Sequence, residues 1–211
     1  MVVVYVEGVD GTGKTTLINQ LIRCHPADDT AAARPLWTYL PAVPVPAAFA
    51  TWVTTTPAAT VAADLLAAQR RRLADLHTLT AQHTIVLVDR GPRTVEASAR
   101  AHLTAQPPDT STPAITQLTA ELHAATRHLA EAHPCLSIEL TTTSYDEILY
   151  RLTDTERRNT AYLRYLRRFL REFRDSTTVN GLTRLCQPAT ASLARNTTAA
   201  CRAIQALTSP P

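Results

Sequence analysis

The sequence is poor in lysine and glycine, and both residue types gather at one place. Lys14 is the only lysine among 21 basic residues, so all the others are arginines. Only five of the 211 residues are glycines, and Gly8, Gly11 and Gly13 lie close together just before Lys14. Glycine adopts backbone conformations that other residues avoid, so such a cluster indicates a local requirement of the backbone. The stretch 8–16 therefore has the strongest local constraints in the chain.

Other shortages exclude whole classes of protein. The four cysteines form no C-x-x-C pair, which argues against a zinc site and a disulfide framework, and we expect reduced, mostly buried thiols. No apolar run approaches the ~20 residues of a membrane span. The N-terminus enters an apolar segment without a basic, cleavable leader, so we expect a cytoplasmic protein with no membrane partner. The formal net charge of +3 is small and does not favour a nucleic-acid partner.

Residues 8–15 read G-x-x-x-x-G-K-T, the pattern of a phosphate-binding loop. An apolar run precedes the loop and helical apolar spacing follows it, which is the strand–loop–helix context that the pattern requires. Backbone N–H groups and the positive end of the helix dipole suit phosphate oxygens. Lys14 is expected to reach the β- and γ-phosphates, and the Thr15 hydroxyl to ligate Mg²⁺. The residues predicted to bind the nucleoside triphosphate are Gly8, Asp10, Gly11, Thr12, Gly13, Lys14, Thr15 and Thr16.

Apolar periodicity predicts strands and helices that alternate along the chain. The expected strands are residues 2–6, 36–40, 85–88, 136–140 and 182–187. The expected helices are residues 17–24, 58–82, 94–104, 115–133, 144–152, 161–174 and 193–207. A capping-box pattern, Ser144-x-x-Glu147, opens the fifth of these helices. Such alternation means an α/β fold with a parallel sheet covered on both faces, which we expect to be one domain over residues 1–211.

Two segments interrupt this pattern. Prolines bracket a stretch that suits neither a central strand nor a long helix, and we expect the Pro- and aromatic-rich segment 34–57 to cover the substrate. Its aromatic side chains are candidates to stack on a base or cap a cleft, with core packing as the alternative: Trp37, Tyr39, Phe49 and Trp52. Residues 153–158 are polar and lack apolar anchors. We predict a lid over about 151–160 that is mobile without ligand and orders over it.

The phosphate loop and the Asp-Arg pair that follows a later strand resemble motifs of a known family. Residues 6–16, Val-Glu-Gly-Val-Asp-Gly-Thr-Gly-Lys-Thr-Thr, are similar to the opening of thymidylate kinases, and Asp89-Arg90 resembles their Asp-Arg motif. Arg70 sits where these enzymes carry an arginine ahead of that motif. The resemblance spans nearly the whole chain in element order. It implies a nucleoside monophosphate kinase fold: a five-stranded parallel sheet, ATP over the loop and an acceptor in a facing cleft.

The resemblance also implies catalytic roles. Phosphoryl transfer depends on positioning and on neutralising charge over the transferred group, for which Lys14, Mg²⁺ and lid arginines are suited. Some family members carry a basic residue in the loop, but Gly11 stands there in this chain. The additional positive charge is therefore expected from the lid. The candidates there are Arg151, Arg157 and Arg158, and the sequence does not choose among them.

Further residues are candidates for the acceptor and the metal. Arg90 is expected to hold the acceptor phosphate, and Asp89 to orient Mg²⁺ or the acceptor, with a structural ion pair as the alternative. Asp10 is a candidate for a sugar hydroxyl, and Arg70 for the acceptor. Glu7 is a candidate base, although thymidylate kinases and deoxynucleoside kinases both carry a glutamate there.

We therefore predict an ATP- and Mg²⁺-dependent kinase that phosphorylates a small, nucleotide-like acceptor. The alternatives are a nucleoside kinase, or a kinase of a modified or non-nucleotide metabolite, on the same fold. A guanine-reading switch protein is disfavoured because its Asn-Lys-x-Asp signature needs a second lysine. A nucleic-acid-dependent ATPase is disfavoured by the chain's size and modest charge. The sequence leaves open whether the chain forms a homodimer.

Thymidylate itself is not the expected acceptor. Thymidylate kinases carry an Ala-Tyr-Gln run downstream of the Asp-Arg motif, whose glutamine helps to read thymine. Counting equally from Asp89 gives Ala97-Ser98-Ala99, so the tyrosine and the glutamine are absent and Ser98 is the remaining polar candidate. The Arg-Glu-Pro-Gly segment of these enzymes is matched only in part, by Arg34-Pro35. We expect a nucleoside monophosphate other than thymidylate.

Overall fold

A computed structural model provides the structure of the protein. It describes residues 1–24, 37–42, 51–52, 55–80, 84–104, 112–142, 144–176, 179 and 181–208. Phe49, the Arg34-Pro35 pair and most of the Pro- and aromatic-rich segment 34–57 lie outside these residues.

Five parallel strands form one sheet in the order β2-β3-β1-β4-β5. Strand β1 (Val2–Glu7) lies at the centre, between β3 (Ile85–Asp89) and β4 (Cys135–Thr141), and β2 (Trp37–Leu40) and β5 (Thr183–Pro188) form the edges. Every residue of β1 and β3 is buried, as in central strands of a parallel sheet. The register pairs Val6 with Asp89 and Glu7 with Glu139, so three strands end at the same edge. The predicted five-stranded parallel sheet is confirmed.

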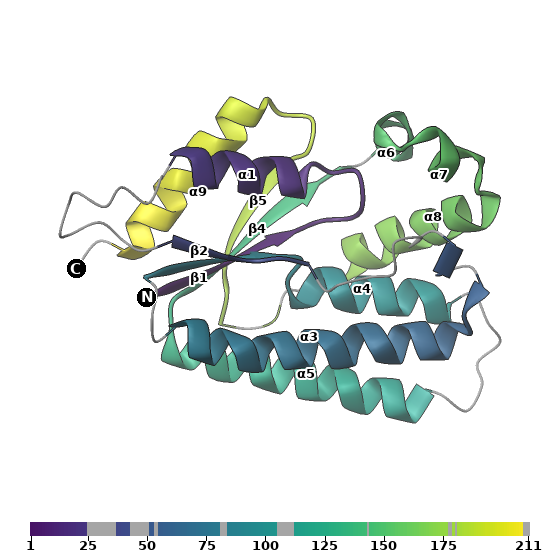
Figure 1. Cartoon of the computed structure of the whole chain (residues 1–211), viewed down its shortest axis with the longest axis horizontal. Coiled ribbons are helices and arrows are strands. Elements are labelled where there is room, and N and C mark those ends of the chain that lie inside the picture. Colours follow the sequence, from purple (N-terminus) through teal and green to yellow (C-terminus); the bar gives the residue numbers. More distant parts are fainter. Residues whose placement is uncertain are drawn as a thin grey trace.

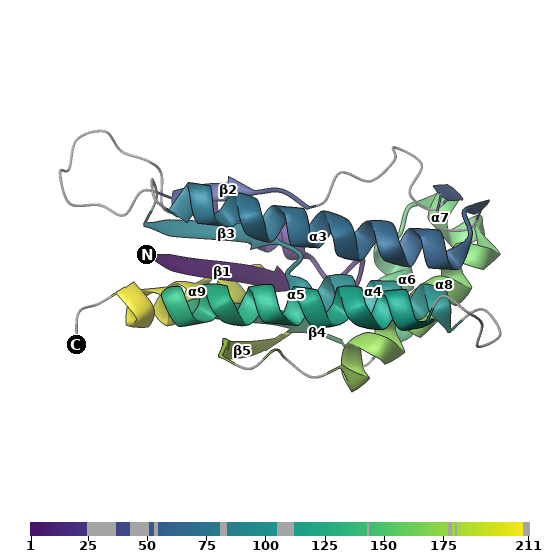
Figure 2. The same cartoon turned by 90° about the horizontal axis from the view of Figure 1, so that it is seen from below.

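Helices cover both faces of this sheet (Figure 1). On one face, α1 (Lys14–Cys24) and α9 (Leu193–Thr208) pack on the even-numbered side chains of β1, such as Val4. On the other face, α3 (Ala58–Thr80), α4 (Pro92–Leu103) and α5 (Thr112–Ala132) cover the odd-numbered side chains, such as Tyr5. Figure 2 shows α3 and α5 side by side beneath the sheet. Helix α8 (Thr160–Asp175) packs against α4 through an inner face rich in aromatic and leucine side chains.

Two short helices, α6 (Tyr145–Arg151) and α7 (Asp154–Arg158), join β4 to α8. At the start of α6 the Ser144 side chain accepts from the Glu147 N–H, but the Glu147 carboxylate accepts from Thr142 instead of completing the predicted capping box. A complete capping box begins α7, formed by Thr153 and Glu156.

The prediction of a polar break at 153–158 is therefore wrong in its local structure. The polar residues that suggested a break are the caps and charges that stabilise a short helix. The predicted mobility of this segment stays a prediction.

All four cysteines are free thiols, but only Cys135 is buried; Cys24 and Cys186 are exposed, which corrects the expectation of mostly buried thiols. Within the described ranges, no helix has the length and apolar character needed to span a membrane.

Candidate functional site

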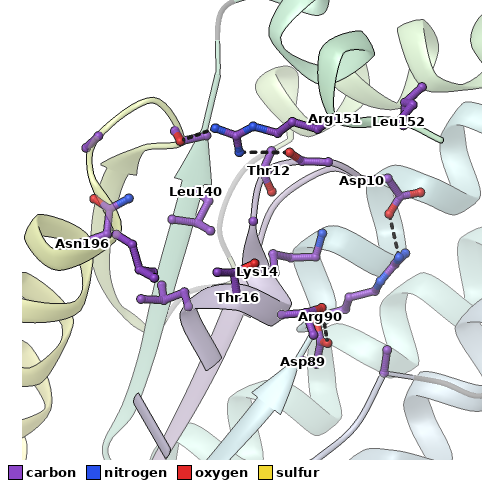
Figure 3. Close-up of a pocket in the computed structure, with 18 of the residues that line it drawn as sticks. Asp10, Thr12, Lys14, Thr16, Asp89, Arg90, Leu140, Arg151, Leu152 and Asn196 are labelled. Atoms are coloured by element: carbon purple, nitrogen blue, oxygen red, sulfur yellow. Dashed lines mark hydrogen bonds and ion pairs between the residues drawn. The ribbon is translucent and has the colours of Figure 1, made fainter. Parts of the chain in front are cut away.

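A cavity of about 880 Å³ lies where the carboxyl ends of β1, β3 and β4 meet the phosphate loop (Figure 3). Ligands of open α/β sheets bind at this edge, and the volume is in the range of small-molecule sites. Its lining comes from the loop and the start of α1, from Ala42 after β2 and Leu140 of β4, from the end of β3, from α6 to α8, and from the segment after β5 with the start of α9. The residues from these later segments are Asp89, Arg90, Arg151, Leu152, Glu156, Tyr162, Ala189, Ala191, Leu193 and Asn196.

The loop conformation depends on glycine at its first position. Gly8 has a φ of 143°, and a Cβ there would lie 2.7 Å from Thr12 Oγ1 and 2.8 Å from the Leu140 carbonyl oxygen. Gly11 and Gly13 also have positive φ. The loop can therefore curl tightly against β4, with residues 10–16 lining the cavity.

Lys14 begins α1, and its side chain is buried beside the loop. Its ammonium donates to the Val9 carbonyl oxygen at 2.8 Å. Burial lowers the pKa of Lys14 to about 8, and Arg90 acts in the same direction, while Asp10 and Asp89 act to raise it. The phosphate loop thus holds a buried amine whose charged form an added anion would stabilise.

Asp89, the last residue of β3, faces Thr15 across the cavity floor. One carboxylate oxygen, Oδ2, accepts from the Thr15 hydroxyl at 3.4 Å and from the Tyr39 hydroxyl at 3.3 Å. The other oxygen, Oδ1, is buried and has no hydrogen-bond partner among the described residues. Mg²⁺ is usually bound by one or two protein oxygens together with waters and phosphates. A hydroxyl, a carboxylate and an unpartnered carboxylate oxygen beside a phosphate loop therefore fit Mg²⁺.

Arg90 has an unusual backbone. Its φ of 62° is the only positive φ of a non-glycine residue in the described part of the chain. Such a conformation costs of the order of 1–3 kcal/mol and is found most often at functional sites. It turns the chain out of β3 so that the guanidinium lies in the cavity and donates to Asp10 at 2.6 Å (Figure 3).

Tyr162 completes this cluster, although no sequence motif singles it out. Its hydroxyl, on α8, donates to Asp10 Oδ2 at 3.2 Å. Burial acts to raise the pKa of Asp10, but the charges of Arg90 and Lys14 outweigh it and hold the pKa below the ordinary value. Asp10 is thus a charged acceptor that links the loop, the segment after β3 and α8.

Glu7 does not line the cavity. Its carboxylate is fully buried and accepts from the backbone N–H groups of Gly91, Arg93 and Thr94, at 2.9–3.3 Å, and from the Thr94 hydroxyl. A Cβ at Gly91 would clash with this carboxylate. Burial raises the pKa of Glu7, although the hydrogen bonds from Thr94 act to lower it. The geometry gives Glu7 a structural role at the N-terminus of α4 and does not support the predicted role of a base.

Arg70 pairs with Glu121 of α5 on the surface and is not among the described residues that line the cavity. Its predicted contact with the acceptor finds no support in this geometry and stays a prediction. Arg72, two residues later, is buried and reaches the carboxyl ends of β2 and β3. The sequence holds a signal for this difference, because Leu65, Gln69, Arg72 and Leu76 are spaced as one buried helix stripe, whereas Arg70 falls off it.

Ser98 also lies away from the cavity. It is buried in the interface between α4 and α8, where its hydroxyl is 2.8 Å from the Tyr165 hydroxyl. His102 stacks on Tyr165 with ring centroids 4.3 Å apart. Ser98 is not among the described residues that line the cavity, and its predicted contact with the acceptor stays a prediction.

The lid arginines occupy different positions. Arg151 lines the cavity and donates to the carbonyl oxygens of Gly11, at 3.1 Å, and Ala189, at 3.0 Å, so it bridges the loop and the segment after β5 (Figure 3). Arg157 pairs with Asp154 on the surface, and Arg158 is exposed. Neither Arg157 nor Arg158 is among the described residues that line the cavity. The geometry favours Arg151 among the three candidates.

The aromatic candidates are also separated. Trp37 pairs in register with Ile85 at the amino end of the sheet, far along the strand from the loop. Tyr39 reaches the site through its hydroxyl, which donates to Asp89. Trp52 packs on the core face that α3 and α4 cover, and Phe49 lies outside the described residues. Tyr39 is thus the aromatic candidate that the structure places in contact with a site residue.

We predict that His102 makes the protein sensitive to acid. Burial lowers the pKa of His102 to about 4, and Arg168 acts in the same direction. Between that value and the ordinary value near 6.5 the unfolded chain binds the extra proton, so stability falls as the pH falls through this window. At about 1.4 kcal/mol per pKa unit, the loss is at most about 3.5 kcal/mol. Urea unfolding at a series of pH values measures it.

His102→Gln should flatten this acid slope, because glutamine does not titrate. His128→Gln is the control, since His128 is an exposed surface residue and its replacement should leave the slope unchanged. Equal slopes in all three proteins would reject the assignment.

Comparisons with known proteins agree with this geometry only at the level of fold. No protein-family model matches the sequence, and no curated protein matches it. In structure the chain is similar to a deoxyadenosine kinase from M. mycoides, solved with bound dATP, with a TM-score of 0.65. The match covers 96% of this chain and 99% of that chain at 9% sequence identity. The chain therefore has the P-loop kinase fold, and the match does not single out thymidylate kinases within it.

Proposed function

We propose that the protein is an ATP- and Mg²⁺-dependent kinase that transfers the γ-phosphoryl group to an anionic, nucleotide-like acceptor. One observation carries the proposal: a single cavity is lined both by a phosphate loop with Lys14 and by an arginine, Arg90, held in a strained backbone conformation. A loop that binds phosphates and a separate cation for a second anion suit a donor and an acceptor.

Different residues of the cavity have different roles in the transfer. Lys14 and the N–H groups of the loop hold the β- and γ-phosphates, and Arg151 lies against the loop, where it supplies further positive charge. Thr15 and Asp89 would hold Mg²⁺, which supplies charge neutralisation between the phosphates. An acceptor oxygen bonds to the γ-phosphorus while the bond from that phosphorus to the bridging oxygen breaks, and ADP leaves.

The cavity favours an acceptor that is already an anion. Among the described residues, the carboxylates that line it are Asp10, Asp89 and Glu156. Asp10 is ion-paired with Arg90, Asp89 fits the metal, and Glu156 caps α7 through Thr153. A hydroxyl acceptor needs a base within hydrogen-bond reach, whereas a phosphate oxygen does not. Arg90 then binds the acceptor phosphate. Its guanidinium either gives up the ion pair with Asp10 or binds Asp10 and the phosphate together.

The acceptor is a nucleoside monophosphate other than thymidylate. The positions that would carry the thymine-reading run hold Ala97, Ser98 and Ala99, all of them buried, and the Ser98 hydroxyl bonds to Tyr165. These positions therefore offer no side chain to read a thymine edge. A site that hydrogen-bonds one base rejects analogues by up to about 10⁴–10⁵-fold, and loss of that reader removes such a preference.

A nucleoside kinase is the second candidate, because the structural neighbour is a deoxyadenosine kinase. The two candidates differ in the group that attacks, a phosphate oxygen or a hydroxyl. They also differ in the need for a base, because a nucleoside kinase needs one near the acceptor hydroxyl and a nucleotide kinase does not.

The test is an acceptor panel with ATP and Mg²⁺ that covers nucleoside monophosphates, nucleosides and phosphonates. We expect a monophosphate other than thymidylate to reach a kcat/KM of about 10⁴ M⁻¹s⁻¹ or more. Thymidylate as the best acceptor would contradict the proposed specificity. Activity confined to nucleosides would establish the second candidate instead, and failure to bind Mg-ATP would reject both.

A further inference from the structure

The buried guanidinium of Arg72 joins two strand ends to α3. Its contacts are to Pro41 O at 2.6 Å, Gln69 Oε1 at 2.7 Å, Asp89 O at 2.9 Å, Arg90 O at 3.1 Å and Leu40 O at 3.3 Å. Leu40 and Pro41 follow one another at the end of β2, and Asp89 and Arg90 at the end of β3. One planar, rigid group therefore fixes both carboxyl ends at the acceptor side of the sheet.

Stability alone is a poor reason for this arrangement. Arg72 is 6% exposed, and none of the described carboxylates lies within 4.0 Å of its guanidinium. Burying this charge without a close carboxylate is costly: burial lowers the pKa of Arg72, and the more distant charge of Asp89 offsets this only in part. The contacts that Arg72 makes are specific in direction, and four of them end on backbone oxygens.

Two of these acceptors are the carbonyl oxygens of Asp89 and Arg90, which both line the cavity. Arg90 has a left-handed backbone, which relaxes unless its surroundings hold it. Its N–H donates to Val6 of β1 at 3.0 Å, and its carbonyl oxygen accepts from Arg72. The Asp89 carbonyl oxygen accepts from the same guanidinium. The directions of the Asp89 and Arg90 side chains therefore follow from where Arg72 holds their backbone.

We propose that Arg72 is a positioning residue: it holds Asp89 toward the metal and Arg90 toward the acceptor without touching either ligand. The inference rests on the proposed function, because it assigns Asp89 and Arg90 the roles given there. It also makes α3 part of the site, although Arg72 is not among the described residues that line the cavity.

The test compares Arg72→Lys with Arg71→Lys in the full chain. Lysine keeps the charge and the aliphatic stem, but one ammonium cannot span the carbonyl oxygens of two strands as a planar guanidinium does. Arg71 is the matched control, because it is the neighbouring residue on α3 and is exposed. Thermal melting of both variants shows that each is folded at the assay temperature.

In Arg72→Lys we expect kcat/KM for the acceptor to fall about 10²-fold and the half-saturating Mg²⁺ concentration to rise, while KM for ATP changes less than about twofold. A purely structural role predicts a lower melting temperature with unchanged kinetic constants. Wild-type constants in Arg72→Lys, or equal losses for ATP and the acceptor, would overturn the proposal. Should Arg72→Lys not fold, Gln69→Met removes one contact of the guanidinium and should give the same pattern at smaller size.

Hydrogen–deuterium exchange tests the positioning without chemistry. Peptides that cover residues 85–91 should exchange faster in Arg72→Lys than in Arg71→Lys, while peptides that cover the loop, residues 8–16, should not change. Unchanged exchange at 85–91 would reject the positioning role. If the wild-type protein phosphorylates no acceptor, the proposed function fails, and the exchange result still decides the role of Arg72.

Discussion

Replacing Lys14 with methionine is expected to lower kcat by at least about 10²-fold, because the charge that develops on the γ-phosphoryl group loses its partner. Methionine keeps most of the buried stem, so the packing beside the loop is retained. The hydrogen bond from the ammonium to the Val9 carbonyl oxygen is lost, which costs about 1 kcal/mol of stability. Steady-state kinetics with saturating ATP and the best acceptor of the panel measure the effect.

Arg23→Met is the control for this variant. Arg23 lies in the last turn of the same helix and is exposed, so the change removes a positive charge from α1 without altering the loop. We expect kcat to stay within about twofold, since surface charges contribute little. Full turnover in a folded Lys14→Met protein would remove the basis for assigning the loop to phosphate binding.

Asp89→Asn is expected to have the second large effect. The change keeps the shape of the side chain but removes the negative charge that suits Mg²⁺, and we expect turnover to fall about 10²-fold or more. The half-saturating Mg²⁺ concentration should rise as well, because the neutral amide oxygen of asparagine binds Mg²⁺ more weakly than a carboxylate beside Thr15 does. A Mg²⁺ titration of initial rates separates the two effects.

Two further variants serve as controls for the Mg²⁺ titration of Asp89→Asn. Asp75→Asn removes an exposed carboxylate from α3 and should leave the titration unchanged. Tyr39→Phe removes the hydroxyl that donates to Asp89 Oδ2 and leaves the carboxylate in place, so its effect should be much smaller. A titration of Asp89→Asn that coincides with the wild type would show that Asp89 does not hold the metal.

The positions of the strands and of the phosphate loop follow from local sequence. A central parallel strand is a continuous apolar run, and a phosphate loop is defined by consecutive residues whose geometry glycine alone permits. The expected strand at 85–88 and the observed β3, Ile85–Asp89, therefore differ by one residue. The same reasoning located Asp89 and Arg90 at the ligand edge, because they follow a buried strand.

The acceptor side could not be predicted in the same way, because its contacts join distant parts of the chain. The Tyr162 hydroxyl meets an aspartate 152 positions earlier, and the Arg72 guanidinium meets carbonyl oxygens of β2, which is remote in sequence. Whether Glu7 faces the ligand or the start of α4 depends on how α4 docks against β1. Periodicity shows which side of an element is buried, but it does not show which neighbour lies there.

By itself, the sequence determined that this protein has a parallel α/β sheet and a loop of the G-x-x-x-x-G-K-T pattern that carries the only lysine of the chain. Both were readable because the apolar pattern of each strand and the loop motif are patterns of residues that lie near one another in the chain. The tertiary structure alone decided that the Arg72 guanidinium meets the ends of β2 and β3, that Glu7 anchors α4, and that Arg151 is the lid arginine beside the loop. These outcomes depend on which buried polar groups find partners when the helices pack on the sheet, and that pairing exists only in the folded chain.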